Sequence, residues 1–176
     1  GSASFSLDTG IPAAPTLVLG TDVSNGATAA EATATTGVVF VTAEAGASTV
    51  VTFSNGSQTV TKTVTGNGSA AVPVVLTSAD LSALGDGPIT VSATTTDAAG
   101  NASSAGSASF TLDTGTPAAP TLTLGAGVSN GATATEATST AGVVFVTAET
   151  GATTVVSFTN GTQTVTKTVT GNGSTA

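Results

Sequence analysis

Residues 37–66 read GVVFVTAEAGASTVVTFSNGSQTVTKTVTG, and in three parts of this stretch apolar side chains alternate with small polar ones. Alternation with a period of two is the pattern of a half-buried β-strand. It predicts strands over 37–44, 48–54 and 58–65. Val51 and Phe53 fall on one face of the middle strand, and the Asn-Gly pair after that strand favours a tight hairpin turn. This stretch is therefore predicted to be antiparallel β structure.

The same alternation continues on both sides of this stretch. It predicts further strands over 15–20, 70–77, 88–96 and 106–112. SADLSALGDG at 78–87 predicts one short helical turn, and no other segment is expected to be helical. About seven short strands separated by frequent turns are typical of an immunoglobulin-like (Ig-like) β-sandwich. The predicted fold class is all-β, with one such sandwich in each repeat of about 105 residues.

Lys62 lies in TVTKTVT at 59–65, on the same face as Val60 and Val64. An inward-facing lysine on an edge strand protects a sheet against edge-to-edge aggregation. We expect this protective role for Lys62 in preference to ligand binding.

The whole chain is organised by an internal repeat. GSASFSLDTGIPAAPTL at 1–17 returns as GSASFTLDTGTPAAPTL at 106–122, and the 105-residue offset continues to residue 176 with 57 of 71 aligned positions identical. The prolines of this segment cannot occupy a central strand, so they mark linkers. The sequence therefore predicts that residues 1–10 are the last strand of a preceding repeat. It predicts a complete Ig-like repeat over 11–115 and the N-terminal part of a following repeat over 116–176.

The composition excludes several classes of function. The chain has two lysines, no arginine and ten acidic residues, with a net charge of −8, and it contains no cysteine or histidine. Disulfides, thiolate or imidazole metal sites and His-dependent nucleophilic catalysis are thereby excluded. Two lysines make no basic patch for nucleic acid, and no apolar run reaches the roughly 18 residues of a membrane helix. Paired carboxylates without an aromatic sugar platform do not indicate a glycosidase, so we expect no enzymatic activity.

The segment 37–66, together with ALGDGPITVSATTTDAAGN at 83–101 and FTLDTGTPAAPTL at 110–122, resembles a known family. The chain resembles, along its whole length, the bacterial Ig-like repeats of very large cell-surface adhesins, including the biofilm-associated type. The resemblance implies extender modules that stack end to end and hold a terminal adhesive domain away from the outer membrane. It also implies type I secretion, an extracellular location at the bacterial cell surface and calcium bound between domains. The DTG of this linker departs from the Asp-Thr-Thr often found in the family, which weakens the calcium expectation.

Calcium binds carboxylate, amide and carbonyl oxygens. In a seven-stranded sandwich, the loops after the second and sixth strands share a pole with the arriving linker. This topology gathers acidic and amide side chains from the linker, from AEAGA and from DAAGN: Asp8, Glu44, Asp97 and Asn101. At the next junction the equivalents are Asp113 and Glu149, and the loop that would complete that site lies beyond residue 176. The resemblance supports Asp8 and the DAAGN loop as ligands more strongly than Glu44.

The alternative is that these residues are solvated loop acids, with Asp97 and Asn101 shaping a turn. Four further acids are expected at the opposite pole as solvated or helix-capping groups: Asp22, Glu31, Asp80 and Asp86. Of these, Asp80 and Asp86 are expected within reach of the next junction.

Three functions remain open from the sequence. The leading expectation is a structural spacer whose partners are the neighbouring repeats of the same chain, and whose properties are length and stiffness. The second is a self-assembling extracellular filament or sheath subunit, because low charge and high β propensity suit strand exchange between like chains. The third is a ligand-binding adhesion module, which would need an exposed aromatic cluster, whereas all six phenylalanines fall at predicted strand positions.

Overall fold

The computed structural model describes residues 1–173 and divides the chain into two compact units, Gly1–Gly115 (unit 1) and Thr116–Ala176 (unit 2). The division falls inside the DTGTPAAP linker.

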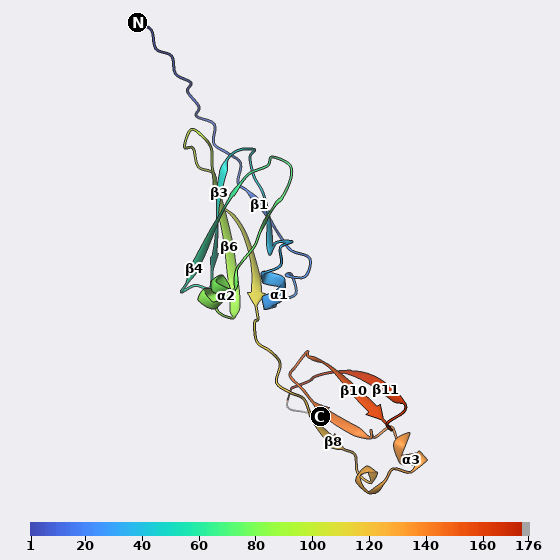
Figure 1. Cartoon of the computed structure of the whole chain (residues 1–176). Helices are drawn as coiled ribbons and strands as arrows, with labels where there is room; N and C mark the ends of the chain where they lie inside the picture. The colour runs from blue at the N-terminus through green and yellow to red at the C-terminus, as the bar shows by residue number, and fades with distance from the viewer. Residues whose placement is uncertain (174–176) are drawn as a thin grey trace. The chain divides into compact units, whose positions relative to one another are not determined.

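Unit 1 consists of two antiparallel sheets and two short helices (Figure 1). The first sheet has the strand order β1-β2-β5, with β1 at Thr16–Leu19, β2 at Val39–Thr42 and β5 at Val72–Val74. The second has the order β4-β3-β6-β7, with β3 at Ser48–Ser54, β4 at Thr59–Thr65, β6 at Gly87–Thr96 and β7 at Gly106–Leu112. The helices α1 (Ala29–Ala32) and α2 (Ser78–Leu84) contact each other at one end of the unit.

The core of unit 1 is shared by the two sheets. Val39 and Val41 of β2 are fully buried, and so are Val51 and Phe53 of β3 and Val91 of β6. These side chains alternate with more exposed threonines and serines, as the period of two predicts. The all-β class is thus confirmed for unit 1.

The strand limits differ from the prediction in the first sheet. The stretch predicted over 70–77 forms strand only at Val72–Val74, because its pairing with β2 covers three residues before the chain reaches Thr77, the N-cap of α2. Leu76, which lies beyond the paired residues, is nevertheless buried in the core.

The expectation that only 78–87 would be helical is wrong. The structure also contains α1, the α3 helix at Ala134–Ala137 and a 3-10 turn, η1, at Val128–Asn130. Thr28 and Glu31 form a capping box, in which the backbone N–H and the hydroxyl of Thr28 each donate to Glu31 Oε2 at 2.8 Å. The backbone hydrogen bond from Thr28, followed by that from its hydroxyl, lowers the pKa of Glu31. The Thr-x-x-Glu pattern is the sequence signal that predicts the start of this helix.

Lys62 lies on the expected face of the edge strand β4, next to the partly buried Val60 and Val64. Its Nζ is 2.5 Å from Asp80 Oδ2, so it joins the edge strand to the first turn of α2. Asp80 also accepts hydrogen bonds from Thr77, which confirms its expected capping role. Burial favours a higher pKa for the Asp80 carboxyl, but the hydrogen bonds from Lys62 and Thr77 outweigh it and hold that pKa below its usual value.

Unit 2 repeats the first half of unit 1. Its strands form two antiparallel pairs, β8 (Thr121–Leu124) with β9 (Val144–Thr147), and β10 (Thr153–Thr159) with β11 (Thr164–Thr170). Their registers match those of β1 with β2 and of β3 with β4 at the 105-residue offset. Several large apolar side chains of unit 2 are exposed, among them Leu122, Val155 and Val165.

Residues 1–15 lie outside the strands, and Phe5 and Leu7 are exposed, whereas their repeat counterparts Phe110 and Leu112 are buried in β7. That residues 1–10 form the last strand of a preceding repeat stays a prediction. None of the helices in residues 1–173 has the length and the apolar run needed to cross a bilayer.

Candidate functional site

The DAAGN loop between β6 and β7 is organised by the carboxylate of Asp97. Its Oδ1 accepts the backbone N–H of Ala99 at 2.9 Å and that of Asn101 at 2.8 Å. The backbone N–H of Asp97 donates in turn to the carbonyl of Asn101 at 3.1 Å, and Gly100 supplies the positive φ of 94° that the turn requires. The turn-shaping role foreseen for these residues is therefore present.

Asn101 connects this loop to the N-terminal linker, 93 residues earlier in the chain. Its Nδ2 donates to Asp97 Oδ2 at 2.9 Å and to the backbone carbonyl oxygen of Asp8 at 3.2 Å. The side-chain hydrogen bond from Asn101, followed by the backbone bonds from Asn101, Ala99 and Gly100, holds the pKa of Asp97 below its usual value. Asp97 therefore stays ionised at neutral pH beside the linker.

The carboxylates of Asp8 and Glu44, the other expected ligands in unit 1, do not lie beside Asp97 and Asn101. The carboxylate of Asp8 accepts the N–H of Gly10 at 2.9 Å and forms a turn within the linker. Glu44 is exposed in the loop between β2 and β3. Within the described part of the chain, no three acidic side chains lie close enough together to hold a metal ion. The structure thus brings together Asp97, Asn101 and the carbonyl of Asp8, but does not gather the carboxylates of Asp8 and Glu44 with them.

Of the counterparts expected at the next junction, Asp113 belongs to unit 1 and Glu149 to unit 2. Asp113 Oδ1 accepts the N–H of Gly115 at 2.9 Å, and its backbone N–H donates to the Ala27 carbonyl at 2.9 Å. Glu149 is exposed in the loop between β9 and β10 of unit 2.

The two oxygens that accept from Asn101 Nδ2 are of the types that hard cations bind. Its Nδ2 lies between a carbonyl oxygen and a carboxylate oxygen, which is a position of negative potential. Oxygen ligands of these types are those that Ca²⁺ takes in proteins. If the amide of Asn101 turned over, its Oδ1 would become a third oxygen donor at the same place.

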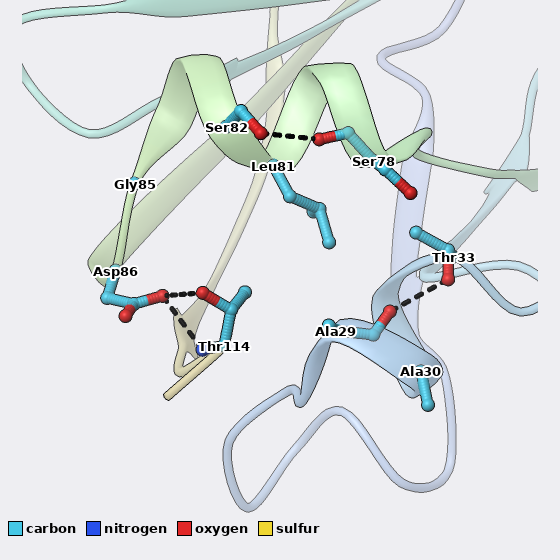
Figure 2. Close-up of a pocket in the computed structure, with 9 residues that line it drawn as sticks. All are labelled: Ala29, Ala30, Thr33, Ser78, Leu81, Ser82, Gly85, Asp86 and Thr114. Carbon is cyan, nitrogen blue, oxygen red and sulfur yellow. Dashed lines mark hydrogen bonds between the residues drawn. The ribbon is translucent and has the colours of Figure 1, made fainter. Parts of the chain in front are cut away.

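The opposite end of unit 1 contacts the C-terminal linker through Asp86. Asp86 Oδ1 accepts both the backbone N–H of Thr114 at 2.8 Å and its hydroxyl at 2.7 Å (Figure 2). The bond from the hydroxyl, followed by that from the backbone, lowers the pKa of Asp86. The sequence indicated a solvated or capping acid within reach of the junction; it did not indicate that Asp86 would bind the linker.

Beside Asp86 lies an open pocket of about 440 Å³ between α1 and α2. Most of its lining side chains are small, and Asp86 is the one ionisable group among them: Ala29, Ala30, Thr33, Ser78, Leu81, Ser82, Gly85, Asp86 and Thr114. The carboxylate of Asp86 in this pocket already accepts two hydrogen bonds from Thr114.

Comparison with protein-family models, with curated proteins and with solved structures finds no match to this chain.

Proposed function

We propose that the chain is part of a structural extender of a large bacterial surface adhesin, built from tandem Ig-like sandwiches that give length and stiffness outside the cell. The observation that carries the proposal is that unit 1 hydrogen-bonds the linker at both of its ends, through Asn101 to Asp8 and through Asp86 to Thr114. A repeat that fixes its linkers in this way transmits orientation to its neighbours, and neighbour contacts determine the stiffness of a repeat array.

The strand orders of unit 1 support an Ig-like sandwich of a particular kind. In the constant-type arrangement the fourth strand joins the sheet of the first, second and fifth strands. Here β4 pairs with β3 instead, which gives the sheets β1-β2-β5 and β4-β3-β6-β7. The Val, Phe and Ile side chains of the shared core replace the Cys–Trp–Cys core of antibody domains.

Calcium at the junctions is the second part of the proposal. Asp97, Asn101 and the Asp8 carbonyl would hold the ion on one side of unit 1, and Glu44, which is exposed in the loop between β2 and β3, is the weaker candidate ligand. A cation bound to the folded form and not to the unfolded chain stabilises the fold by mass action, and it removes the freedom of the linker.

Calcium titration of the chain, followed by calorimetry and small-angle scattering, tests this second part. We expect a higher melting temperature of unit 1 with calcium, and no such response in Asp97→Ala. An equal response in Asp97→Ala would place the ion elsewhere. No response in the parent chain would remove calcium from the proposal and leave a spacer whose linkers are held by hydrogen bonds alone.

Exposed apolar side chains on unit 2 favour the filament subunit as a second candidate. Val155, Val165 and Phe158 lie on the hairpin of β10 and β11, and Val155 is 60% exposed. Apolar surface of this kind supports association between chains. Sedimentation distinguishes the candidates, because a spacer remains an extended monomer at high concentration whereas a filament subunit forms polymers.

A further inference from the structure

The sequence contains six Asn-Gly pairs, at 25–26, 55–56, 67–68, 130–131, 160–161 and 172–173. In such a pair the backbone nitrogen of the glycine attacks the asparagine side-chain amide most readily, because glycine has no Cβ to hinder the approach. Two of the pairs are repeat counterparts in one kind of hairpin turn, Asn55-Gly56 between β3 and β4, and Asn160-Gly161 between β10 and β11. They allow one turn to be compared in two surroundings.

The backbone of the two turns is the same. In each, the asparagine N–H donates to the glutamine carbonyl three residues later at 3.2 Å. Gly56 has a φ of 93° and Gly161 a φ of 94°. The glycine N–H donates to the hydroxyl oxygen two residues earlier, which is Ser54 Oγ at 3.0 Å in one turn and Thr159 Oγ1 at 3.1 Å in the other. The attacking nitrogen therefore has a hydroxyl partner in both turns.

The side-chain oxygen of Asn160 is surrounded by donors. Its Oδ1 accepts the backbone N–H of Thr162 at 3.0 Å, the hydroxyl of Thr162 at 3.0 Å and the backbone N–H of Gln163 at 2.7 Å. When the Gly161 nitrogen attacks the side-chain carbon, negative charge develops on this oxygen, and donors that already point at it stabilise that charge. The turn thus presents the nucleophile together with the donors that its attack requires.

Asn55 differs at the leaving group. Its Oδ1 accepts the backbone N–H groups of Ser57 at 2.8 Å and Gln58 at 2.7 Å, while its Nδ2 donates to the carbonyl oxygen of Leu84, the last residue of α2. Nδ2 is the atom that departs as ammonia, so this bond must break first. Among the described residues, the hydrogen bonds of the Asn160 side chain are all made by Oδ1, and its Nδ2 is not held.

We propose that Asn160-Gly161 is a self-modification site that deamidates in the folded chain, whereas the contact with Leu84 protects the same turn at Asn55. The turn around Asn160 promotes the reaction through the donors to Oδ1, and the α2 helix of unit 1 prevents it by holding Nδ2 of Asn55. This chemistry goes beyond the proposed spacer function and does not depend on it.

The reaction consumes one water molecule and releases one ammonia molecule. The Gly161 nitrogen forms a bond to Cγ of Asn160 and gives up its proton, and Nδ2 takes up a proton and leaves as ammonia. The product is a cyclic succinimide. Water then adds to one of its two carbonyl carbons and breaks the bond from that carbon to the ring nitrogen, which gives aspartate or isoaspartate. Each event adds one negative charge to a chain whose net charge is already −8.

The test is site-resolved mass spectrometry of the whole chain after ageing in mildly alkaline buffer, with a parallel sample in guanidinium chloride. In the folded chain Asn160 should convert about threefold to tenfold faster than Asn55, the factor that corresponds to the net contribution of one neutral hydrogen bond. In denaturant both turns lose their contacts, and the two sites should convert at equal rates.

The two samples also separate promotion from protection. Asn160 should convert faster in the folded chain than in denaturant, and Asn55 should convert more slowly. Conversion of Asn55 as fast as Asn160 in the folded chain would overturn the proposal. So would a difference between the sites that persists in denaturant, or an Asn160 that converts no faster when folded, since its lability would then belong to the sequence alone.

Two variants of the exposed Thr162 test the donors to Oδ1. Thr162→Val removes the hydroxyl donor, keeps the backbone N–H and should slow the conversion of Asn160 about threefold. Thr162→Ser is the matched control, because it keeps the hydroxyl and reproduces the residue of the Asn55 turn, and it should convert at the parent rate. Equal rates in the two variants would contradict the role of Oδ1 as the site of the developing charge.

Discussion

At the scale of single residues, unit 1 contains a buried polar pair that the sequence did not predict. Thr49 of β3 and Thr95 of β6 are both fully buried, and their hydroxyl oxygens lie 2.9 Å apart across the sheet. The backbone N–H of Thr95 also donates to Ser103 Oγ at 3.0 Å. Threonine is so frequent in this chain that no sequence pattern distinguishes these two from their exposed neighbours.

A double-mutant cycle measures how much the hydrogen bond between Thr49 and Thr95 contributes to the free energy of unfolding. Thr49→Val or Thr95→Val leaves one buried hydroxyl without its partner and should lower the free energy of unfolding by about 1–3 kcal/mol. The double variant should cost less than the sum of the two, because it removes both polar groups together. Denaturant unfolding of the four chains checks this, and additive losses would show that the hydroxyls do not depend on each other.

Asp86, which accepts hydrogen bonds from the linker residue Thr114, and Asp97, which holds Asn101 beside the other linker, predict a pH dependence. Hydrogen bonds in the folded state lower the pKa of Asp86 and of Asp97. Their contribution is therefore complete above the unfolded value of about 3.9, and it is lost as the pH falls through the lower folded values. The linker contacts should persist at neutral pH and weaken only in strong acid.

Carboxyl-carbon NMR titration, recorded together with the Thr114 amide shift, measures this dependence. Both signals should move in the same transition below about pH 3.9. Thr114→Val removes the hydroxyl contact and should raise the pKa of Asp86 toward its ordinary value. An Asp86 that titrates above that value in the parent chain would contradict the hydrogen-bond geometry.

At the scale of elements, the strands were predictable because alternation with a period of two is a local signal. The hairpin of β3 and β4 lies at Ser48–Ser54 and Thr59–Thr65, within one residue of its predicted limits. The four-residue helix α1 was missed, since so short an element has no periodicity of its own and only its Thr-x-x-Glu capping pattern marks it. For Lys62 the face was predicted but the partner Asp80 was not, because the partner depends on how α2 packs on the sheet.

Gly66, which directly follows β4, lies closely against the loop after β2. A Cβ at this position would lie 2.1 Å from the Glu44 carbonyl oxygen, so only glycine allows the end of β4 to pass the loop after β2. The repeat counterpart Gly171 has the same contact with the Glu149 carbonyl at 2.1 Å. The close approach is therefore a property of both units.

We expect Gly66→Ala to lower the free energy of unfolding of unit 1 by about 1–3 kcal/mol, because the backbone of either segment must move. Ala45→Ser, an exposed change in the neighbouring loop, serves as the control and should have little effect. Thermal unfolding measures both. Equal melting temperatures for Gly66→Ala and the parent chain would show that the loop can move to accept the Cβ without a loss of stability.

At the scale of the whole molecule, the sequence predicts which loops meet at one end of the sandwich. It does not predict contacts that depend on the detailed conformation of two loops. Topology alone was enough to place the Asp8 linker beside DAAGN, and the Asn101 contact over 93 residues lies where that reasoning put it. The Asp86–Thr114 contact spans 28 residues between two loops, and no spacing rule relates them. The internal repeat allows a further comparison, because it places equivalent side chains in two different surroundings.

Phe53 and Phe158 are one such pair, and they predict unequal stability of the two units. Phe53 is fully buried in unit 1, whereas its counterpart Phe158 is 37% exposed in unit 2. Phe53→Ala opens a cavity in a closed core and should cost about 3–5 kcal/mol, whereas Phe158→Ala removes a side chain that has fewer neighbours and should cost clearly less.

Hydrogen exchange of the backbone amides resolves the two units within one chain. Amides of β3 and β6 should exchange by global opening of unit 1, and those of β10 and β11 should exchange faster. Phe53→Ala should accelerate the first group only. Equal protection of both groups, or equal losses from the two substitutions, would mean that the apolar face of unit 2 is covered in solution, and association between chains would then be the explanation to test by sedimentation.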